Sequence, residues 1–513
     1  MMTMTLSEIA EAVGGDLDLS AVAGAARTAQ TPLATTVVSD SRQVGEGSVF
    51  VAIKGERVDG HDFVAGVAGA GAVAAIVEHK VPEAAIAQIV VADSVRALGA
   101  LARHNIERRR ACSAPFTIVG ITGSVGKTTT KDLLKAMLSQ LGGTVAPVGS
   151  FNNDIGLPLT ALKVDGSTRY FVAEMGANHV GEIAYLTTIA PPDIAVVLKV
   201  GVAHLGEFGS VERIALAKSE IIRGLVPHGV SVLNADDAHV AAMAGIAPGD
   251  VIWFGRDAHA ADGRIPVLEA RDVHHDELDH PSFVLAKGTE SAEVHLAICG
   301  DHNVMNALAA ATVADHLGLG LADIARVLTD QRHISPHRMA VSEVRRDDVT
   351  FTLIDDSFNA NPDSMRAGLD GLAAWGASRS RQPSRIAVLG SMLELGDDEH
   401  ELHRSIGAYA AGLGVDALIA VGSETDASLD ALAADIARGA RETGDAGLTV
   451  ELVHTAAQAD ASVRAIVAHA CDPVVLLKGS HASGLNALAD QWAVQLPAPA
   501  VGDGGSATGR RAS

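Results

Sequence analysis

The most informative stretch of the chain reads Ile118-Val-Gly-Ile-Thr-Gly-Ser-Val-Gly-Lys-Thr-Thr-Thr-Lys131. The apolar residues 116–121 predict a short buried strand, and apolar residues at helical spacing after Lys127 predict a helix. The glycine-bearing loop 122–126 joins the two. This order predicts a phosphate-binding loop, because glycines let backbone N–H groups approach phosphates and a helix N-terminus carries partial positive charge.

The loop has the short form G-x-x-G-K-T, since Ile121 rather than glycine stands five residues before Gly126. We expect Lys127 to reach the terminal phosphates of a nucleotide and the Thr128 hydroxyl to take a Mg²⁺ position. An ordinary glycine turn is the alternative, which the Lys-Thr-Thr sequence at the helix start disfavours. The predicted phosphate contacts are Gly123, Ser124, Val125, Gly126, Lys127, Thr128 and Thr129.

Length and composition predict a cytoplasmic protein of several domains. A chain of 513 residues corresponds to about three domains, and its net charge of −23 disfavours nucleic acid as a partner. The three cysteines have no metal-binding spacing and fit a reducing compartment. The N-terminus lacks the basic region of a signal peptide, and the longest apolar run, 63–77, is shorter than the roughly 20 residues that span a bilayer. Membrane insertion is therefore not expected.

The alternation of strand-like and helical stretches predicts an α/β fold of three domains. We expect a small α/β N-terminal domain over residues 1–113 and a central parallel-sheet domain, like a P-loop ATPase, over 114–330. Within the latter, the polar residues 255–296 are expected to form a loop and small-strand insertion. A C-terminal Rossmann-like domain is expected over 331–497, followed by a compositionally disordered tail, 498–513. No G-x-G-x-x-G occurs, so nothing supports a nicotinamide or flavin site.

Polar residues follow three strands predicted for the central domain. Glu174 comes directly after the strand-like run 170–173. His204 comes shortly after the run 194–200. Ligands of parallel sheets bind beyond the carboxyl ends of the strands, so Thr128, Glu174 and His204 are expected at one Mg²⁺ site, although histidine is a less common Mg²⁺ ligand. Taken singly, Glu174 also fits a helix-start carboxylate, and His204 fits a loop histidine bonded to backbone.

Lys218 is expected on the apolar face of the helix 211–225, together with Ile214, Ile221 and Ile222. One interpretation is a snorkelling lysine, whose stem is buried while its ammonium reaches water. The other interpretation is functional. A lysine whose pKa is lowered by burial would react with CO₂ to form a carbamate, which is an anionic metal ligand.

Two further groups of polar residues have open interpretations. Hydroxyl groups with Arg42, Lys54 and His61 surround a short predicted strand near the N-terminus. They suit a diphosphate or sugar ligand, and equally the caps and turns of a small domain. Asn303 and Asn306 are amides that fit an adenine edge, and equally the polar start of a helix.

Taken together and in order, several motifs resemble those of the Mur ligase family, the ATP-dependent amide-forming enzymes of cytoplasmic peptidoglycan precursor synthesis. The resemblance covers the chain from Ser39 to about Ser480. It rests on Thr122-Gly-Ser-Val-Gly-Lys-Thr-Thr129, Glu174-Met-Gly-Ala-Asn-His179, Ala203-His204, Ala217-Lys-Ser-Glu220, Leu233-Asn-Ala-Asp-Asp237, Gly300-Asp-His-Asn303, Arg338 and Leu477-Lys-Gly-Ser480.

Further motifs resemble the family member that joins D-alanyl-D-alanine to UDP-N-acetylmuramoyl-tripeptide. They are Phe151-Asn-Asn-Asp-Ile-Gly-Leu-Pro158, Glu174-Met-Gly-Ala-Asn-His-Val-Gly-Glu182 and Asp355-Asp-Ser-Phe-Asn-Ala-Asn-Pro362. The segments Asp40-Ser-Arg42 and Asp59-Gly-His61 resemble the family's uridine-nucleotide-binding domain. His481 and Phe358 depart from the pattern, because they stand where arginine and tyrosine are usual.

The resemblance implies a two-step reaction, and we expect the protein to be a monomer. The tripeptide carboxylate attacks the γ-phosphate of ATP to give an acyl phosphate, and the amine of D-alanyl-D-alanine then displaces phosphate. One alternative is another ligase of the superfamily, either the enzyme that adds a diamino acid or one that adds glutamate to folate. The other is a non-catalytic nucleotide switch or scaffold.

The resemblance also assigns roles to residues. Two Mg²⁺ ions would be held partly by Thr128, Glu174, His204 and a carbamylated Lys218. The catalytic groups would be Lys127, Glu174, His204 and Lys218. Beyond the loop, ATP would be contacted by Asn303 at adenine and by Arg338 and Asp356 from the third domain. The substrate contacts would be Ser41, Arg42, Lys54, Asp59, His61, Asn152 and Asn153.

Overall fold

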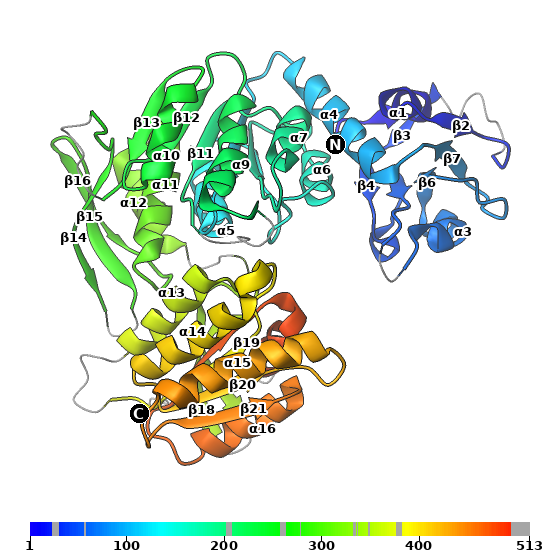
Figure 1. The fold of residues 1–513 in the computed structure, drawn as a ribbon. Helices are drawn as coiled ribbons and strands as arrows, with labels where there is room; N and C mark the ends of the chain where they lie inside the picture. Colours follow the sequence, from blue (N-terminus) through cyan, green and yellow to red (C-terminus); the bar gives the residue numbers. More distant parts are fainter. Residues whose placement is uncertain are drawn as a thin grey trace, which may run out of the picture. The chain divides into compact units, whose positions relative to one another are not determined.

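The computed structural model describes residues 1–22, 30–55, 58–201, 208–256, 263–276, 279–331, 335, 337–346, 349–375 and 382–493. The chain divides into two compact units, each built from strands alternating with helices (Figure 1). The first unit comprises 1–338, 361–367 and 393–399, and the second comprises 339–360, 368–392 and the residues from 400 onward. None of the described helices is long and apolar enough to cross a membrane.

The N-terminal part of the first unit is a small α/β arrangement. Its elements are β1 (Met4–Thr5), α1 (Leu6–Val13), β2 (Asp16–Asp18), β3 (Pro32–Ala34), β4 (Thr36–Val38), β5 (Ser48–Val51), α3 (Val64–Val67), β6 (Ala72–Val77), β7 (Ala87–Val90) and α4 (Ser94–Arg110). Over its described residues, the main sheet has the order β2-β7-β6-β5-β4, parallel except for the antiparallel edge strand β2. The buried Arg109 of α4 donates to the Thr168 carbonyl, which ties this part to the residues that follow.

A parallel sheet forms the middle of the first unit. Its elements are β8 (Thr117–Thr122), α5 (Lys127–Leu138), β9 (Thr144–Val145), α6 (Gly156–Ala161), β10 (Tyr170–Glu174), α7 (Glu182–Ile189), β11 (Ile194–Val197), α9 (Val211–Arg223), β12 (Val230–Asn234), α10 (Ala238–Ala242), β13 (Val251–Phe254), α11 (His302–His316) and α12 (Leu321–Asp330). In the described part, the strand order is β13-β12-β11-β8-β10-β9, and every pairing is parallel. The end of β10 lies beside the end of β8, since Glu174 is in register with Ile121. The carboxylate of Glu174 and the start of the phosphate loop therefore lie side by side at the same edge of the sheet.

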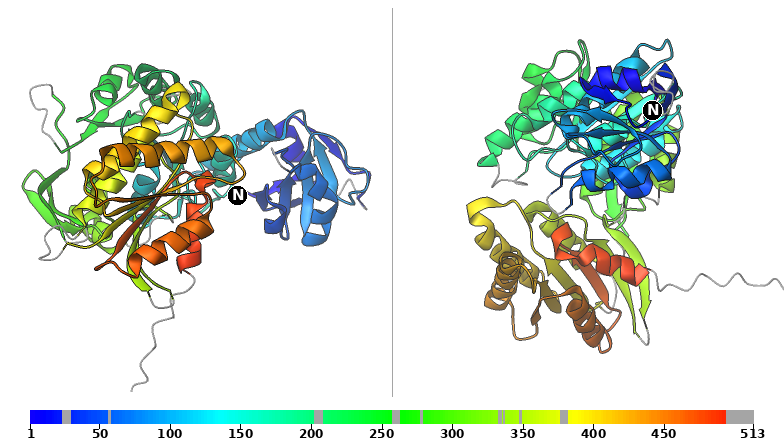
Figure 2. Two further views of the ribbon diagram at one scale, coloured as in Figure 1. Left: turned by 60° about the horizontal axis from the view of Figure 1, so that its bottom comes forward. Right: turned by 90° about the vertical axis from the view of Figure 1, so that its right-hand side faces the viewer.

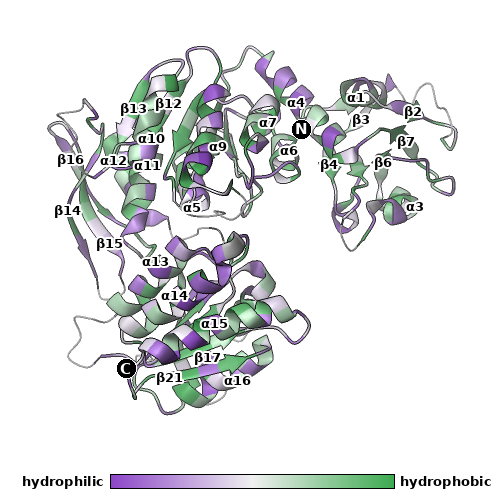
Figure 3. Cartoon of the chain, viewed as in Figure 1, coloured by the Kyte–Doolittle hydropathy of each residue, from purple (hydrophilic) through white to green (hydrophobic). Residues whose placement is uncertain are grey.

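Both faces of this sheet are covered, which explains why its strands read as continuous apolar runs. Ile118 belongs to the core beneath α6, α7 and α9, whereas its neighbour Val119 belongs to the core beneath α5, α11 and α12. Successive side chains of a strand point to opposite faces, so neither face can be polar. Figure 3 shows these strands mainly at the hydrophobic end of the scale.

Two boundaries differ from those expected. Glu174 is the last residue of β10 rather than the residue after it, and β11 ends at Val197 instead of Val200. The helix-start interpretation of Glu174 is therefore wrong. The predicted small-strand insertion is present as an antiparallel sheet of β14 (Glu269–His275), β15 (Pro281–Lys287) and β16 (Glu290–His295).

The second unit is a Rossmann-like sheet with helices on both faces (Figure 2). The third part of the chain contains β17 (Ala340–Arg346), β18 (Val349–Asp356), α13 (Pro362–Ala374), β19 (Arg385–Gly390), α14 (Glu399–Gly412), β20 (Ala417–Val421), α15 (Ala427–Thr443), β21 (Thr449–Val453), α16 (Ala456–Val467), β22 (Val474–Lys478) and α17 (Leu485–Ala493). Over the described strands, the order is β17-β18-β22-β19-β20-β21, with only β17 antiparallel. Helices α16 and α17 share one core with this sheet, and Trp492 is buried in it.

Candidate active site

The predicted strand, loop and helix are present as β8, residues 123–126 and α5. Lys127 folds back over the loop, and its Nζ donates a hydrogen bond of 2.7 Å to the carbonyl oxygen of Gly123. Gly126 begins α5 with a φ of 83°, a conformation that glycine adopts without strain. Backbone N–H groups, the helix N-terminus and the ammonium together make an anion-binding corner.

Asn306 of α11 supports this loop from outside it. A Cβ on Gly126 would come within 2.2 Å of Asn306 Oδ1, so the loop backbone and the amide approach closely. Asn306 Nδ2 donates to Asn303 Oδ1 at 2.8 Å, and Asn303 Nδ2 donates to the Cys299 carbonyl at 2.6 Å. Asn303 is only 2% exposed, so this network favours a role in supporting the loop. Its contact with adenine stays a prediction.

We expect Gly126→Ala to weaken nucleotide binding by at least about tenfold, or 1.4 kcal/mol. The new methyl group would collide with Asn306 Oδ1, and a positive φ costs alanine about 1–2 kcal/mol in addition. Gly318→Ala is the matched control, since Gly318 has a φ of 93° and no atom within 4 Å of its Cβ position. Nucleotide titration and thermal unfolding of both variants separate the collision from the backbone strain. Equal nucleotide affinity in the two variants would contradict the role given to Asn306.

Glu174 is fully buried and gathers three hydrogen-bond donors. Thr128 Oγ1 donates to Oε2 at 3.1 Å. Ser150 Oγ and Asn152 Nδ2 donate to Oε1 at 2.9 and 2.8 Å. The structure therefore brings Thr128 and Glu174 together, as expected from the ends of their strands. Asn152, which was expected only as a substrate contact, also bonds Glu174. Ser150 was missed by the sequence analysis, and its only signal was its position directly before the motif at Phe151.

Arg338 brings a second cation to this corner. Its Nη2 lies 3.4 Å from Thr128 Oγ1. Burial lowers the pKa of Lys127, and the charge of Arg338 lowers it further against the opposing effect of Glu174. Two cations and a helix N-terminus beside one carboxylate match a polyphosphate that carries a divalent cation.

Lys218 lies on α9 with only 2% of its surface exposed. Its Nζ is 3.4 Å from the Ala177 carbonyl oxygen and 5.6 Å from the centre of the Phe208 ring. Burial, and then the charge of Lys127, lower the pKa of Lys218 to about 7 against the opposing effects of Glu182 and Glu220. A snorkelling lysine keeps its ammonium in water, so that interpretation is wrong here.

The donors at this corner suit Mg²⁺, which prefers oxygen and is commonly held by one or two carboxylates and substrate phosphates. Glu174 and Thr128 supply a carboxylate and a hydroxyl, although the described residues contain no group of three or more metal-binding side chains. His204 falls in the segment 202–207, which lies outside the described residues, as does the predicted tail.

Three stretches of the chain match known family domains. They match the Mur ligase family, catalytic domain, over residues 34–106, the Mur ligase middle domain over 121–314, and the Mur ligase, glutamate ligase domain, over 337–481. The UDP-N-acetylmuramoyl-tripeptide–D-alanyl-D-alanine ligase of Mycobacterium tuberculosis (strain ATCC 25618 / H37Rv) is 42% identical over 513 residues, which cover 96% of this chain and 98% of that protein. The chain belongs to the Mur ligase family.

Other relatives of this Mur ligase carry the same name or its short form. The Escherichia coli (strain K12) protein named UDP-N-acetylmuramoyl-tripeptide–D-alanyl-D-alanine ligase is 34% identical, with 83% of this chain and 88% of that protein covered. A crystal structure of MurF from Acinetobacter baumannii aligns with a TM-score of 0.77 at 32% identity, covering 96% and 99% of the two chains. The MurF ligase of Thermotoga maritima, in complex with ADP, aligns with a TM-score of 0.70 at 27% identity, covering 89% and 96%.

The substrate residues predicted in the N-terminal part of this Mur ligase have local partners. His61 is 5% exposed, with Nδ1 at 2.6 Å from Asp59 Oδ1, and its Nε2 accepts from the Glu78 N–H at 2.9 Å. Lys54 forms a backbone bridge with Asp59. These contacts favour the turn-holding interpretation for His61, because both ring nitrogens are engaged. Arg42 follows Ser41 on a 3₁₀ turn and pairs with Asp40 at 2.8 Å, although its side chain is 88% exposed.

The other predicted residues of this Mur ligase are placed as follows. Asn153 Oδ1 accepts from the N–H of Gly156, the first residue of α6, at 2.8 Å, whereas Asn152 donates to Glu174. In the second unit, Asp356 lies 2.5 Å from Nζ of Lys478, which is itself 1% exposed. The structure thus gives Asp356 an ion-pair partner from the predicted Lys-Gly-Ser motif.

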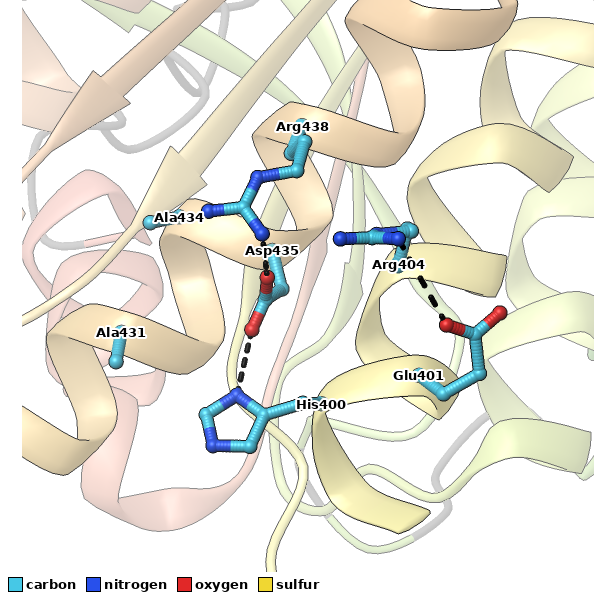
Figure 4. Close-up of a pocket in the computed structure, with 7 residues that line it drawn as sticks. All are labelled: His400, Glu401, Arg404, Ala431, Ala434, Asp435 and Arg438. Carbon is cyan, nitrogen blue, oxygen red and sulfur yellow. Dashed lines mark hydrogen bonds and ion pairs between the residues drawn. The ribbon is translucent and has the colours of Figure 1, made fainter.

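A surface pocket of about 430 Å³ lies between α14 and α15 of the second unit (Figure 4). Its Asp435 carboxylate is 2.6 Å from His400 Nδ1 and 3.1 Å from Arg438 Nη1. None of the site residues predicted from the sequence lines it, so we assign it no part in the reaction. Its lining residues are His400, Glu401, Arg404, Ala431, Ala434, Asp435 and Arg438.

Proposed function

We propose that this Mur ligase joins D-alanyl-D-alanine to UDP-N-acetylmuramoyl-tripeptide, with conversion of ATP to ADP and phosphate, in cytoplasmic peptidoglycan precursor synthesis. The observation that carries the proposal is the 42% identity, over nearly the full length of both chains, to a ligase named for these two substrates. The geometry of the site is consistent with it. The segment that begins with Phe151 is one of the motifs resembling this ligase, and it delivers Asn152 to Glu174.

The proposed first step takes place over the phosphate loop. A carboxylate oxygen of the tripeptide forms a bond to the γ-phosphorus, and the bond from phosphorus to ADP breaks. Lys127 and Arg338 offset the negative charge on the transferring phosphoryl group, and a preorganised site makes that electrostatic effect strong. The product is an acyl phosphate, which is needed because a free carboxylate is inert to amines.

The proposed second step forms the amide. The amine nitrogen of D-alanyl-D-alanine attacks the acyl carbon, the carbon–oxygen bond to phosphate breaks, and the amine loses a proton to solvent. Mg²⁺, when bound, would neutralise phosphate and carboxylate charge. Thr128, Glu174, a carbamylated Lys218 and His204 would hold the ions, two in number.

The remaining assignments are part of this proposal. The N-terminal domain, residues 1–113, binds the uridine nucleotide through the loops that carry Ser41, Arg42, Lys54 and Asp59, with His61 fixing one of them. The domain 114–330 binds ATP, with Asn303 at adenine, and the domain 331–497 contributes Asp356. We propose that the protein acts as a monomer.

The deciding experiment is acceptor-dependent phosphate release. Purified protein with ATP, Mg²⁺ and UDP-N-acetylmuramoyl-tripeptide should release phosphate only when D-alanyl-D-alanine is added. Release with diaminopimelate and the precursor that lacks the third residue, or with glutamate and folate, would instead assign another ligase of the superfamily. ATP binding without release for any acceptor would favour the nucleotide switch and overturn the proposal.

A further inference from the structure

Lys131 is a fully buried lysine one turn beyond Lys127 on α5. Its Nζ donates to the carbonyl oxygens of Pro147 and Gly149 at 2.9 and 3.1 Å, and to Ser335 Oγ at 3.3 Å. It also lies 2.6 Å from Asp132 Oδ1. A buried ammonium is costly unless it is paired and hydrogen-bonded, and this one has partners on three segments.

The first of these segments leads to the carboxylate side of the site. Gly149 directly precedes Ser150, whose hydroxyl donates to Glu174. Asn152, two residues further, donates to the same oxygen. A shift of the Gly149 carbonyl would therefore be passed by the backbone to Ser150 and Asn152, two of the donors to Glu174.

The second segment leads to the cationic side of the site. The backbone N–H of Ser335 donates to Asp132 Oδ2 at 2.8 Å. Ser335 lies three residues before Arg338, whose guanidinium reaches Thr128. The ion pair of the buried Lys131 with Asp132 thus bonds both Ser335, which is close in sequence to Arg338, and the stretch that presents Ser150 and Asn152.

We propose that Lys131 and Asp132 are positioning residues that fix two walls of the acyl-phosphate-forming site relative to the phosphate loop. One wall is Ser150 and Asn152 beside Glu174, and the other is Arg338. The inference rests on the proposed function. The pair of Lys131 and Asp132 differs from an ordinary core ion pair in what its loss would do. Loss of Lys131 should displace the two walls while Lys127 and Thr128 keep their places on α5. Displacements of about 1 Å reduce turnover by about a hundredfold, whereas nucleotide affinity depends mainly on the loop itself.

The test compares Lys131→Met with Lys135→Met, an exposed lysine one turn further along α5. For Lys131→Met we expect kcat for acceptor-dependent phosphate release to fall about a hundredfold. Affinity for a non-hydrolysable ATP analogue should stay within about threefold, and half-maximal activity should require more Mg²⁺. Lys135→Met should match the wild type in all three measurements.

Asp132→Asn is the second variant, for use if Lys131→Met does not fold. It removes the charge of Asp132 and keeps the side-chain volume. Its kcat should fall about tenfold with nucleotide affinity unchanged. Wild-type turnover in a folded variant of either residue would overturn the inference, as would a parallel loss of nucleotide affinity and kcat. A wild-type protein without acceptor-dependent phosphate release would instead overturn the proposed function, so the two failures are distinguishable.

Discussion

Glu174→Gln is expected to lower kcat for acceptor-dependent phosphate release by about 10²–10³-fold. Glutamine keeps the shape of the side chain and can still bond Ser150, Asn152 and Thr128, so the buried site should remain folded. What it removes is the negative charge that would hold Mg²⁺. Charge stabilisation by a bound metal is worth several kcal/mol, and each 1.36 kcal/mol corresponds to about tenfold in rate.

The measurement is phosphate release as a function of Mg²⁺ concentration. We expect the variant to need more Mg²⁺ than the wild type and to keep its thermal stability. Glu293→Gln is the matched control, since Glu293 lies on a strand of the same unit with its side chain 82% exposed. An unchanged Mg²⁺ profile in Glu174→Gln would remove this carboxylate from the metal site.

Lys218→Ala is expected to lose turnover by a similar factor and to regain part of it when formate or acetate is added. The truncated side chain leaves room beside Ala177 and Phe208, and a short carboxylate there would replace the carbamate. With its pKa lowered to about 7, about half of the Lys218 amine is neutral at pH 7, against about one in 3,000 for an ordinary lysine. Only the neutral amine reacts with CO₂. A variant that keeps wild-type turnover without added carboxylate would end the carbamate hypothesis.

The same pKa predicts how stability depends on pH when CO₂ is excluded. Because burial disfavours the charged form of Lys218, keeping this side chain charged in the folded protein carries a penalty in the free energy of unfolding. This penalty is fully present below pH 7. The penalty disappears as pH rises from about 7 to 10.5, where the unfolded lysine also becomes neutral. The stability advantage of Lys218→Met over the wild type should therefore shrink across that window. Denaturant titrations at several pH values would measure it, and a constant difference would contradict a buried, unmodified amine.

Much of the central sheet could be predicted because its signals are local. A buried strand, a loop with two glycines and a helix start follow one another within 14 residues, from Ile118 to Lys131. Glu174 could be placed at the same edge because parallel strands end together, a rule that needs only the strand positions. Lys218 could be assigned to an apolar face from spacing alone.

The missed parts depend on contacts between residues distant in sequence. Ser150 and Lys131 act through partners 24 and 204 residues away, which no local pattern specifies. His61 shows the opposite problem. From the sequence, a histidine near hydroxyls fits a ligand site and the turns of a small domain equally well. Only the fold reveals that Asp59 and the backbone of Glu78 are bonded to its two nitrogens.

The close approach of Asn306 to Gly126 has a consequence for how fast the protein captures its nucleotide. A loop backbone that is held in place by packing has little conformational entropy left to lose when a ligand arrives. The loop backbone becomes ordered when α11 packs against α5 during folding, before the protein meets a nucleotide. Capture should then be governed by diffusion and electrostatic attraction rather than by a slow rearrangement of the loop.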